Sequence, residues 1–336
     1  MPAASGSPRK WANFAAVYTA IALLFGWYAA VQLRRFPMGA MPVAAIYGCL
    51  LLLFGLYLAA GCAAPRAWLA ERLHGARGGA ACVALFLLPY LIYCAGTGDF
   101  RWLAFAKVFG LAAVPLGLFA LAPVRSPKRM NWQDVLVLLW LMLPVFLGWI
   151  GGIWNKPINL DFMARVFLVG VGSWSFLIFR GVEGSGYEFT FSRTIARDAA
   201  VNFVVFAILS IPLGLAIRFI AWNPQWRGVQ ALVFDYATIF LFVAVTEELF
   251  FRGLIQNLLE GSLDSRYAAQ AITSVLFGFS HIFHAPFPNW RYVALATLAG
   301  WFYGSAYRRH RSLMASAATH ALVDTLWRTF FTLGRV

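Results

Sequence analysis

The sequence predicts an all-α polytopic membrane protein with about 11 transmembrane helices. Of its 336 residues, 61% are apolar and only 12% are charged, and the mean hydropathy is +0.71. Apolar runs near the ~20 residues that cross ~30 Å of hydrocarbon recur from end to end. A transmembrane β-barrel would instead show ten-residue strands of alternating polarity, and the sequence contains no such pattern.

Eleven spans are expected in order along the chain. They cover about 11–33, 42–63, 79–96, 102–122, 133–151, 162–179, 199–220, 230–256, 266–284, 290–306 and 312–332. Prolines such as Pro157 and Pro224 punctuate the connections, because proline stops helices. The longest polar stretch, 181–198, is the expected connector between an N-terminal six-span region, 1–180, and a C-terminal region, 199–336.

The basic residues are spread over the short connections between spans. The net charge is +14, but no single element gathers it, so we expect contact with the lipid bilayer and not with nucleic acid. With a cytoplasmic N-terminus, the cytoplasmic connections carry 16 Lys and Arg residues and the opposite connections carry 8. The positive-inside rule therefore predicts an integral membrane protein whose N-terminus is cytoplasmic.

Ionisable residues gather in the second half of the chain. An insertion cost of a few kcal/mol per charge means that such groups are paired, hydrated or functional. Glu248 and Arg252 are four residues apart on a helix, so they are expected to pair. Glu247 lies about 100° further round the helix and is a candidate general base. The alternative is a hydrated helix end at which all three groups meet solvent. Asp235 is expected to be a hydrated residue at the opposite end of this helix.

Two further spans carry histidines. His281 could pack or catalyse, and His284 could join it as a metal pair or lie at the interface, which we favour. His320 and Asp324 share a helix face. Their pairing either satisfies both groups in the bilayer or fixes the His320 tautomer, so that the imidazole donates to an oxyanion.

A Glu-Glu-xxx-Arg, a Phe-xxx-His and a His-xxx-Asp motif thus follow one another on three hydrophobic segments. This pattern closely resembles the CPBP family of type II CAAX-prenyl-endopeptidases and bacteriocin-processing membrane proteases, also called the ABI family. The resemblance covers roughly 200–332. It implies an intramembrane protease core in 199–336, in a bacterial cytoplasmic membrane, that hydrolyses a peptide bond of a membrane-associated or C-terminally anchored substrate.

The resemblance also implies roles for the motif residues. Glu247 would activate water with help from His281, and His320 with Asp324 would stabilise the oxyanion. The Glu and Arg that pair in the first motif would support the helix end. Because the family has been described both as metalloproteases and as glutamate-type proteases, we expect either no required cofactor or one zinc ion. The ligands of that zinc ion would be Glu247, His281, His320 and Asp324.

Asp324 departs from the commoner family pattern, which has Asn at this position. An amide can donate to an oxyanion, whereas an ionised carboxylate repels it. Asp324 is therefore expected to be protonated, to orient His320 or to help bind a cation.

Simple straight spans do not bring the motifs to one depth. At ~1.5 Å per residue, Glu247 lies ~13 Å from a helix end near Gln256, while His281 lies ~22 Å from Arg266. At least one of these helices must be tilted, broken or misplaced. Two other functions stay open: a non-catalytic scaffold or immunity-type protein, and a proton-coupled transporter.

Overall fold

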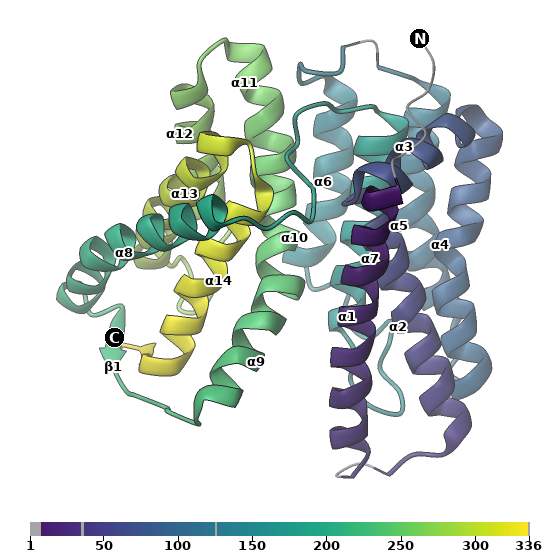
Figure 1. Ribbon diagram of the computed structural model, residues 1–336, viewed down its shortest axis with the longest axis horizontal. Helices are drawn as coiled ribbons and strands as arrows, with labels where there is room; N and C mark the ends of the chain where they lie inside the picture. Colours follow the sequence, from purple (N-terminus) through teal and green to yellow (C-terminus); the bar gives the residue numbers. More distant parts are fainter. Residues whose placement is uncertain (1–7, 35–36, 125, 335–336) are drawn as a thin grey trace. The chain divides into compact units, whose positions relative to one another are not determined.

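The computed structural model describes residues 8–34, 37–124 and 126–334. Within these ranges the chain is helical apart from loops and one two-stranded ribbon, which confirms the all-α membrane class (Figure 1). Seven of the described helices are long and apolar enough to cross a membrane. Residues 1–7, which contribute to the topology prediction, lie outside the described part.

Two compact units divide the chain between Glu183 and Gly184, inside the expected connector; Lys128–Met130 belong to the second unit. In the first unit, α2 packs against α4 and α7, and α5 packs against α4 and α6. The helices of the first unit are α1 (Pro8–Leu33), α2 (Ala40–Ala60), α3 (Ala63–Arg72), α4 (Gly75–Thr97), α5 (Trp102–Leu121), α6 (Trp132–Phe146), α7 (Phe162–Ser173) and the π-helical η1 (Trp174–Phe179).

A buried ion pair joins two helices of the first unit. Arg180, at the end of η1, donates to Asp134 in the first turn of α6 through Nε at 2.8 Å and Nη2 at 3.1 Å. Both side chains are fully buried. The Asp134 carboxylate also accepts from the backbone N–H of Asn131, closing a capping box at the start of α6. Such a bidentate pair holds the two helix ends at a fixed distance and angle.

The second unit is built round one continuous helical column, Val229–Leu263 (Figure 1, green). This column is divided into α9 (Val229–Ile239), the π-helical η2 (Phe240–Ala244), α10 (Val245–Glu248), the π-helical η3 (Leu249–Gln256) and α11 (Asn257–Leu263). The other elements of the second unit are α8 (Arg193–Ala216), β1 (Ile220–Trp222), α12 (Arg266–Phe279), α13 (Trp290–His310), α14 (Leu313–Phe330) and β2 (Phe331–Leu333).

Helix α14 is central in this unit, because it packs against the column, α8 and α13. Helices α12 and α13 form a close hairpin. At Gly278 on α12, an added Cβ would lie only 1.9 Å from Thr297 Oγ1 and 2.7 Å from Val293 O on α13. The missing side chain therefore lets the two helices approach just before His281.

The depth mismatch expected from straight spans comes from two misplaced helix ends. The column continues to Leu263, beyond the expected end at 256, so Glu247 lies ~24 Å from its end. The next helix stops at Phe279, before the expected end at 284, and His281 follows it in a turn. Glu247 and His281 therefore lie at similar depths from the 263–266 connection.

The column extends further because its polar residues are buried in pairs. Arg311, between α13 and α14, donates to Asn257 Oδ1 at 2.8 Å and to Glu260 Oε2 at 2.7 Å. Gln256 donates to Glu260 Oε1 at 3.2 Å. These contacts also place the start of α14 beside α11, which brings His320, two turns further on, towards the level of Glu248.

Residues 184–198 of the expected connector are part of the second unit's structure. Residues 193–198 already belong to α8. In the preceding segment, Gly186 accepts a backbone hydrogen bond from Leu313 and has φ of 65°, and an added Cβ would lie 2.1 Å from Arg311 O. Tyr307 donates to Gly184 O at 2.8 Å. The segment is thus fastened to the turn that starts α14.

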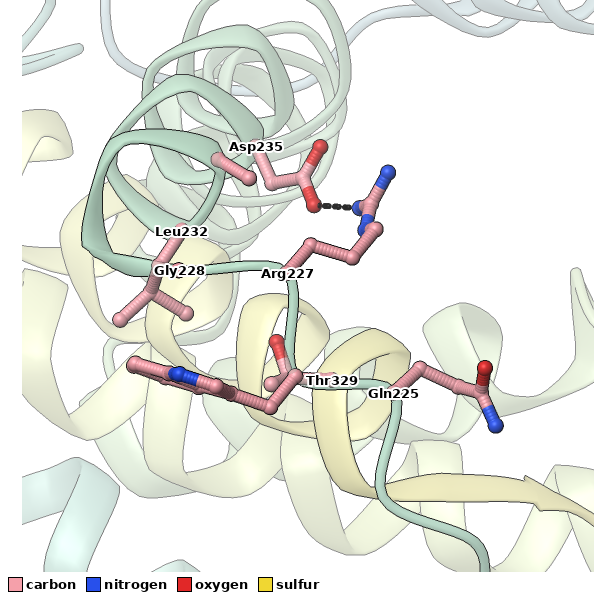
Figure 2. A pocket seen from close by; sticks show the side chains of 8 residues that line it. Gln225, Arg227, Gly228, Leu232, Asp235 and Thr329 are labelled. Carbon is pink, nitrogen blue, oxygen red and sulfur yellow. Dashed lines mark hydrogen bonds and ion pairs between the residues drawn. The ribbon is translucent and has the colours of Figure 1, made fainter.

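Asp235 is buried and ion-paired, so the expectation of a hydrated end residue is wrong. Arg227 donates to Asp235, and Figure 2 shows the two side chains facing each other beside Thr329. Arg328 on α14 approaches the other carboxylate oxygen at 3.6 Å. The two guanidinium groups compensate the buried charge and tie the start of the column to the end of α14.

The Asp134–Arg180 pair can be tested by stability. Asp134→Ala leaves the buried guanidinium opposite no carboxylate, and we expect it to lower the free energy of unfolding by about 3–5 kcal/mol. Thermal unfolding of the detergent-solubilised protein would show this as a lower Tm. Combining Asp134→Leu with Arg180→Met removes both charges and should recover most of the loss. A double variant less stable than Asp134→Ala would contradict this interpretation.

Candidate active site

The carboxylate of Glu248 contacts three side chains of the second unit, Arg252, Ser316 and His320. It is fully buried. Its Oε1 lies 2.8 Å from His320 Nδ1 and accepts from Arg252 Nη1 at 3.2 Å. Its Oε2 accepts from Ser316 Oγ at 2.5 Å and lies 3.2 Å from Arg252 Nε. The expected Glu248–Arg252 pair is present, and it also holds two side chains of α14.

Arg252 links this carboxylate to α13. Its guanidinium is fully buried and donates through Nη2 to the carbonyl of Gly300 at 2.9 Å. The same guanidinium lies over the rings of Phe277, 4.7 Å from the centroid, and Tyr303, at 5.4 Å. Cation–π contacts of this kind are strongest where water is excluded. Arg252 therefore fixes the column against both α12 and α13.

The imidazole of His320 has a neighbour at each ring nitrogen and a third against one face of the ring. An ionised carboxylate only accepts hydrogen bonds, so we assign a proton to Nδ1, opposite Glu248. Nε2 lies 3.5 Å from Asp324 Oδ2, and the ring stacks on Tyr303 at 4.5 Å and 12°. The His320 side chain is 4% exposed, whereas that of Asp324 is 40% exposed. The Nε2 edge therefore faces the open side of the cluster.

His281 follows α12 and reaches the same cluster. Its Nδ1 lies 2.9 Å from the carbonyl oxygen of Phe277. A carbonyl only accepts, so Nδ1 carries the proton and Nε2 is the accepting nitrogen of the neutral ring. The ring contacts Tyr292 at 4.6 Å and the Phe277 ring at 4.9 Å. His284 is exposed and stacks on His281 at 5.6 Å.

Glu247 is half-buried, unlike its neighbour Glu248. It interacts electrostatically with Arg252, Tyr292 and Tyr303. Asp324 interacts electrostatically with His281 and with the same two tyrosines. The acidic and histidine residues predicted on three separate segments thus approach one another round the tyrosines of α13.

The predicted metal ligands do not form a compact donor set. In the part of the chain that the structure describes, no group of three or more His, Cys, Asp or Glu side chains is arranged to hold a metal ion. The ring nitrogens of His320 face carboxylates on two different helices. The zinc ion expected with Glu247, His281, His320 and Asp324 therefore finds no ready-made group of ligands among the described residues.

Three site residues escaped the sequence reading: Ser316, Tyr292 and Tyr303. Ser316 lies four residues before His320, so the helical spacing that pairs His320 with Asp324 also puts Ser316 on that face. The tyrosines lie on α13, which carries none of the three motifs. Their only sequence signal is the spacing of Tyr292 and Tyr303, eleven residues or about three turns, which places both on one side of the helix.

Comparison with known proteins finds one family. Residues 229–326 match the family model described as type II CAAX prenyl endopeptidase Rce1-like. The matched region lies within the second unit and includes the column, α12, α13 and most of α14. No curated protein and no solved structure shows significant similarity to the chain.

The buried pair at the centre of the site should be a large contribution to stability. Arg252→Met keeps most of the side-chain volume but removes the cation opposite Glu248, and we expect a loss of about 3–5 kcal/mol. The matched control is Arg193→Met on the exposed start of α8, which should change stability by less than about 0.5 kcal/mol. Thermal unfolding in detergent compares the two, and equal melting temperatures would count against the central role of Arg252.

Proposed function

We propose that this integral membrane protein is an intramembrane endopeptidase, because residues 229–326 match the family model of type II CAAX prenyl endopeptidases. Its substrate would be a membrane-associated or C-terminally anchored protein, cleaved where the polypeptide enters the site of the second unit. Glu247 and His281 would activate water, and His320 would stabilise the oxyanion.

The observation that supports these roles is the contrast between two adjacent carboxylates. Glu248 is fully buried and is bound by Arg252, His320 and Ser316, so its lone pairs are committed to holding helices. Glu247 is half-buried and lies within electrostatic range of the tyrosines of α13. A general base must reach a water molecule and the scissile carbonyl, and only the second of these environments allows that.

In the first step, the water oxygen attacks the scissile carbonyl carbon while its proton passes to the Glu247 carboxylate. The electron pair of the carbonyl moves to its oxygen, which becomes an oxyanion. His281 would orient the water, because its Nδ1–H is committed to Phe277 O and its Nε2 can accept a hydrogen bond. Orientation and base catalysis together lower the barrier for attack.

His320, protonated on both ring nitrogens, would donate to the developing oxyanion from Nε2. The Glu248 carboxylate holds Nδ1–H and favours the protonated ring when negative charge develops nearby. In the second step, the tetrahedral intermediate collapses and the carbon–nitrogen bond breaks. The proton held by Glu247 passes to the leaving amine, which restores the carboxylate. Glu248, Arg252 and Ser316 act as positioning residues throughout.

Glu247→Gln tests the proposal, because it keeps the shape of the side chain and removes the base. We expect cleavage to fall by about 10²- to 10⁴-fold. Quantitative proteomics of membranes from cells with wild-type or Glu247→Gln protein would show substrates accumulating uncleaved in the variant. Glu71→Gln changes an exposed carboxylate in the first unit and serves as the matched control, with substrate levels like those of the wild type.

Two outcomes would contradict the proposal. Identical membrane proteomes in wild-type and Glu247→Gln cells would exclude Glu247 as the base and favour the non-catalytic scaffold. Proton flux in liposomes that depends on Glu247, without any cleavage product, would instead favour the proton-coupled transporter.

A further inference from the structure

On the open side of the site, a negative charge on Asp324 would oppose the formation of an oxyanion. Its side chain is 40% exposed and lies 3.5 Å from the His320 nitrogen that faces this side. An ionised carboxylate has no proton to donate and repels a negatively charged oxygen. A peptide oxyanion forming beside His320 would therefore need a second, neutral donor to offset the repulsion by Asp324.

Tyr292 presents such a donor. Its ring is fixed between His281, 4.6 Å away, and Trp327, stacked at 6.1 Å and 24°, with Phe219 at 5.1 Å. Its backbone N–H is capped by Asn289 at 3.0 Å, which fixes the residue in the first turn of α13. The position of the phenol ring is therefore set by the packing of His281, Trp327 and Phe219 around it.

The hydroxyl of Tyr292 lies within electrostatic range of the two carboxylates of the site. It interacts electrostatically with both Asp324 and Glu247. Within the described ranges, the Tyr292 hydroxyl has no hydrogen bond to another protein group, and the residue is half-buried. A hydroxyl in a half-buried residue that the protein itself does not bind is available to a substrate.

Tyr303 is a weaker candidate for the same role. Its ring stacks face to face on His320 and lies under the Arg252 guanidinium, so it is part of the packing that orients His320. It is 2% exposed. Tyr292 is half-buried, and its ring contacts His281, the proposed water-orienting residue, at 4.6 Å.

We propose that Tyr292 is a catalytic residue that donates a hydrogen bond from its hydroxyl to the oxyanion and thereby offsets the carboxylate of Asp324. The proton stays on the phenol, so no bond to it is made or broken. This inference rests on the proposed endopeptidase function. It predicts that the effect of removing the Tyr292 hydroxyl on cleavage depends on whether Asp324 carries its charge.

A double-mutant cycle tests this dependence. The substrate is the membrane protein that accumulates in Glu247→Gln cells, reconstituted with the full-length chain in liposomes. Tyr292→Phe keeps the ring and should lower kcat by about 10²- to 10³-fold, with little change in KM. In the Asp324→Asn background, whose amide supplies a donor, the same change should cost less than about 10-fold. Tyr267→Phe, on the exposed start of α12, is the matched control.

The outcomes separate this inference from the proposed function. If Glu247→Gln abolishes cleavage but Tyr292→Phe has the same effect in both backgrounds, or none, the role of Tyr292 is wrong and the peptidase stands. Coupling of Asp324 to Tyr303→Phe in place of Tyr292→Phe would also overturn it. If Glu247→Gln leaves cleavage unchanged, both proposals fall together.

A folding control keeps the test decisive. Tyr292→Phe should leave the melting temperature unchanged, because the hydroxyl is not bound by the described part of the protein. If the variant unfolds, 3,5-difluorotyrosine at position 292 replaces it: this residue keeps the ring and changes the acidity of the hydroxyl. A shift in kcat at constant KM would support the donor role, and an unchanged kcat would overturn it.

Discussion

The second unit is organised round one buried negative charge. The Glu248 carboxylate has to be compensated because it lies in a region from which water is excluded. Compensation comes from Arg252 on the same column and from Ser316 and His320 on α14, and Arg252 in turn binds the α13 carbonyl of Gly300. Satisfying this one charge therefore fixes the distances among the column, α13 and α14. The more exposed Glu247 takes its position from that framework.

Helical spacing made the pairs within one helix predictable from the sequence. The contacts between helices depend on tertiary packing. The four-residue intervals of Glu248 to Arg252 and His320 to Asp324 indicate pairs within one helix, and both approaches are present. The Glu248–His320 contact joins residues 72 positions apart. No spacing rule reaches that far, because the contact depends on how α14 lies against the column.

The helix ends were misjudged for a related reason. The polar residues Gln256, Asn257 and Glu260 look like the end of an apolar span, yet Arg311 satisfies two of them and the helix continues to Leu263. Conversely, the apolar residues after Phe279 look like a continuing span, although the chain turns there. Hydropathy measures transfer from water to lipid, and it cannot register a partner supplied by a distant loop. The buried Asp134–Arg180 pair of the first unit escaped notice in the same way.

The two adjacent acids lie in a short α-helical turn, Val245–Glu248, with π-helical segments on both sides. A π-helical turn accommodates one residue more than an α-helical turn, and such turns are frequent at functional sites. The direction in which the two carboxylates point thus depends partly on the number of residues in the flanking π-helical turns. Deleting one residue from Phe240–Ala244 would return that segment towards regular α-helix, and the narrower turn would redirect the side chains of the segment just before Glu247 and Glu248. Both acids would be retained, and the packing of the turn before them would still change. In this part of the protein, the spacing of the backbone is as specific a determinant of chemistry as the identity of the acids.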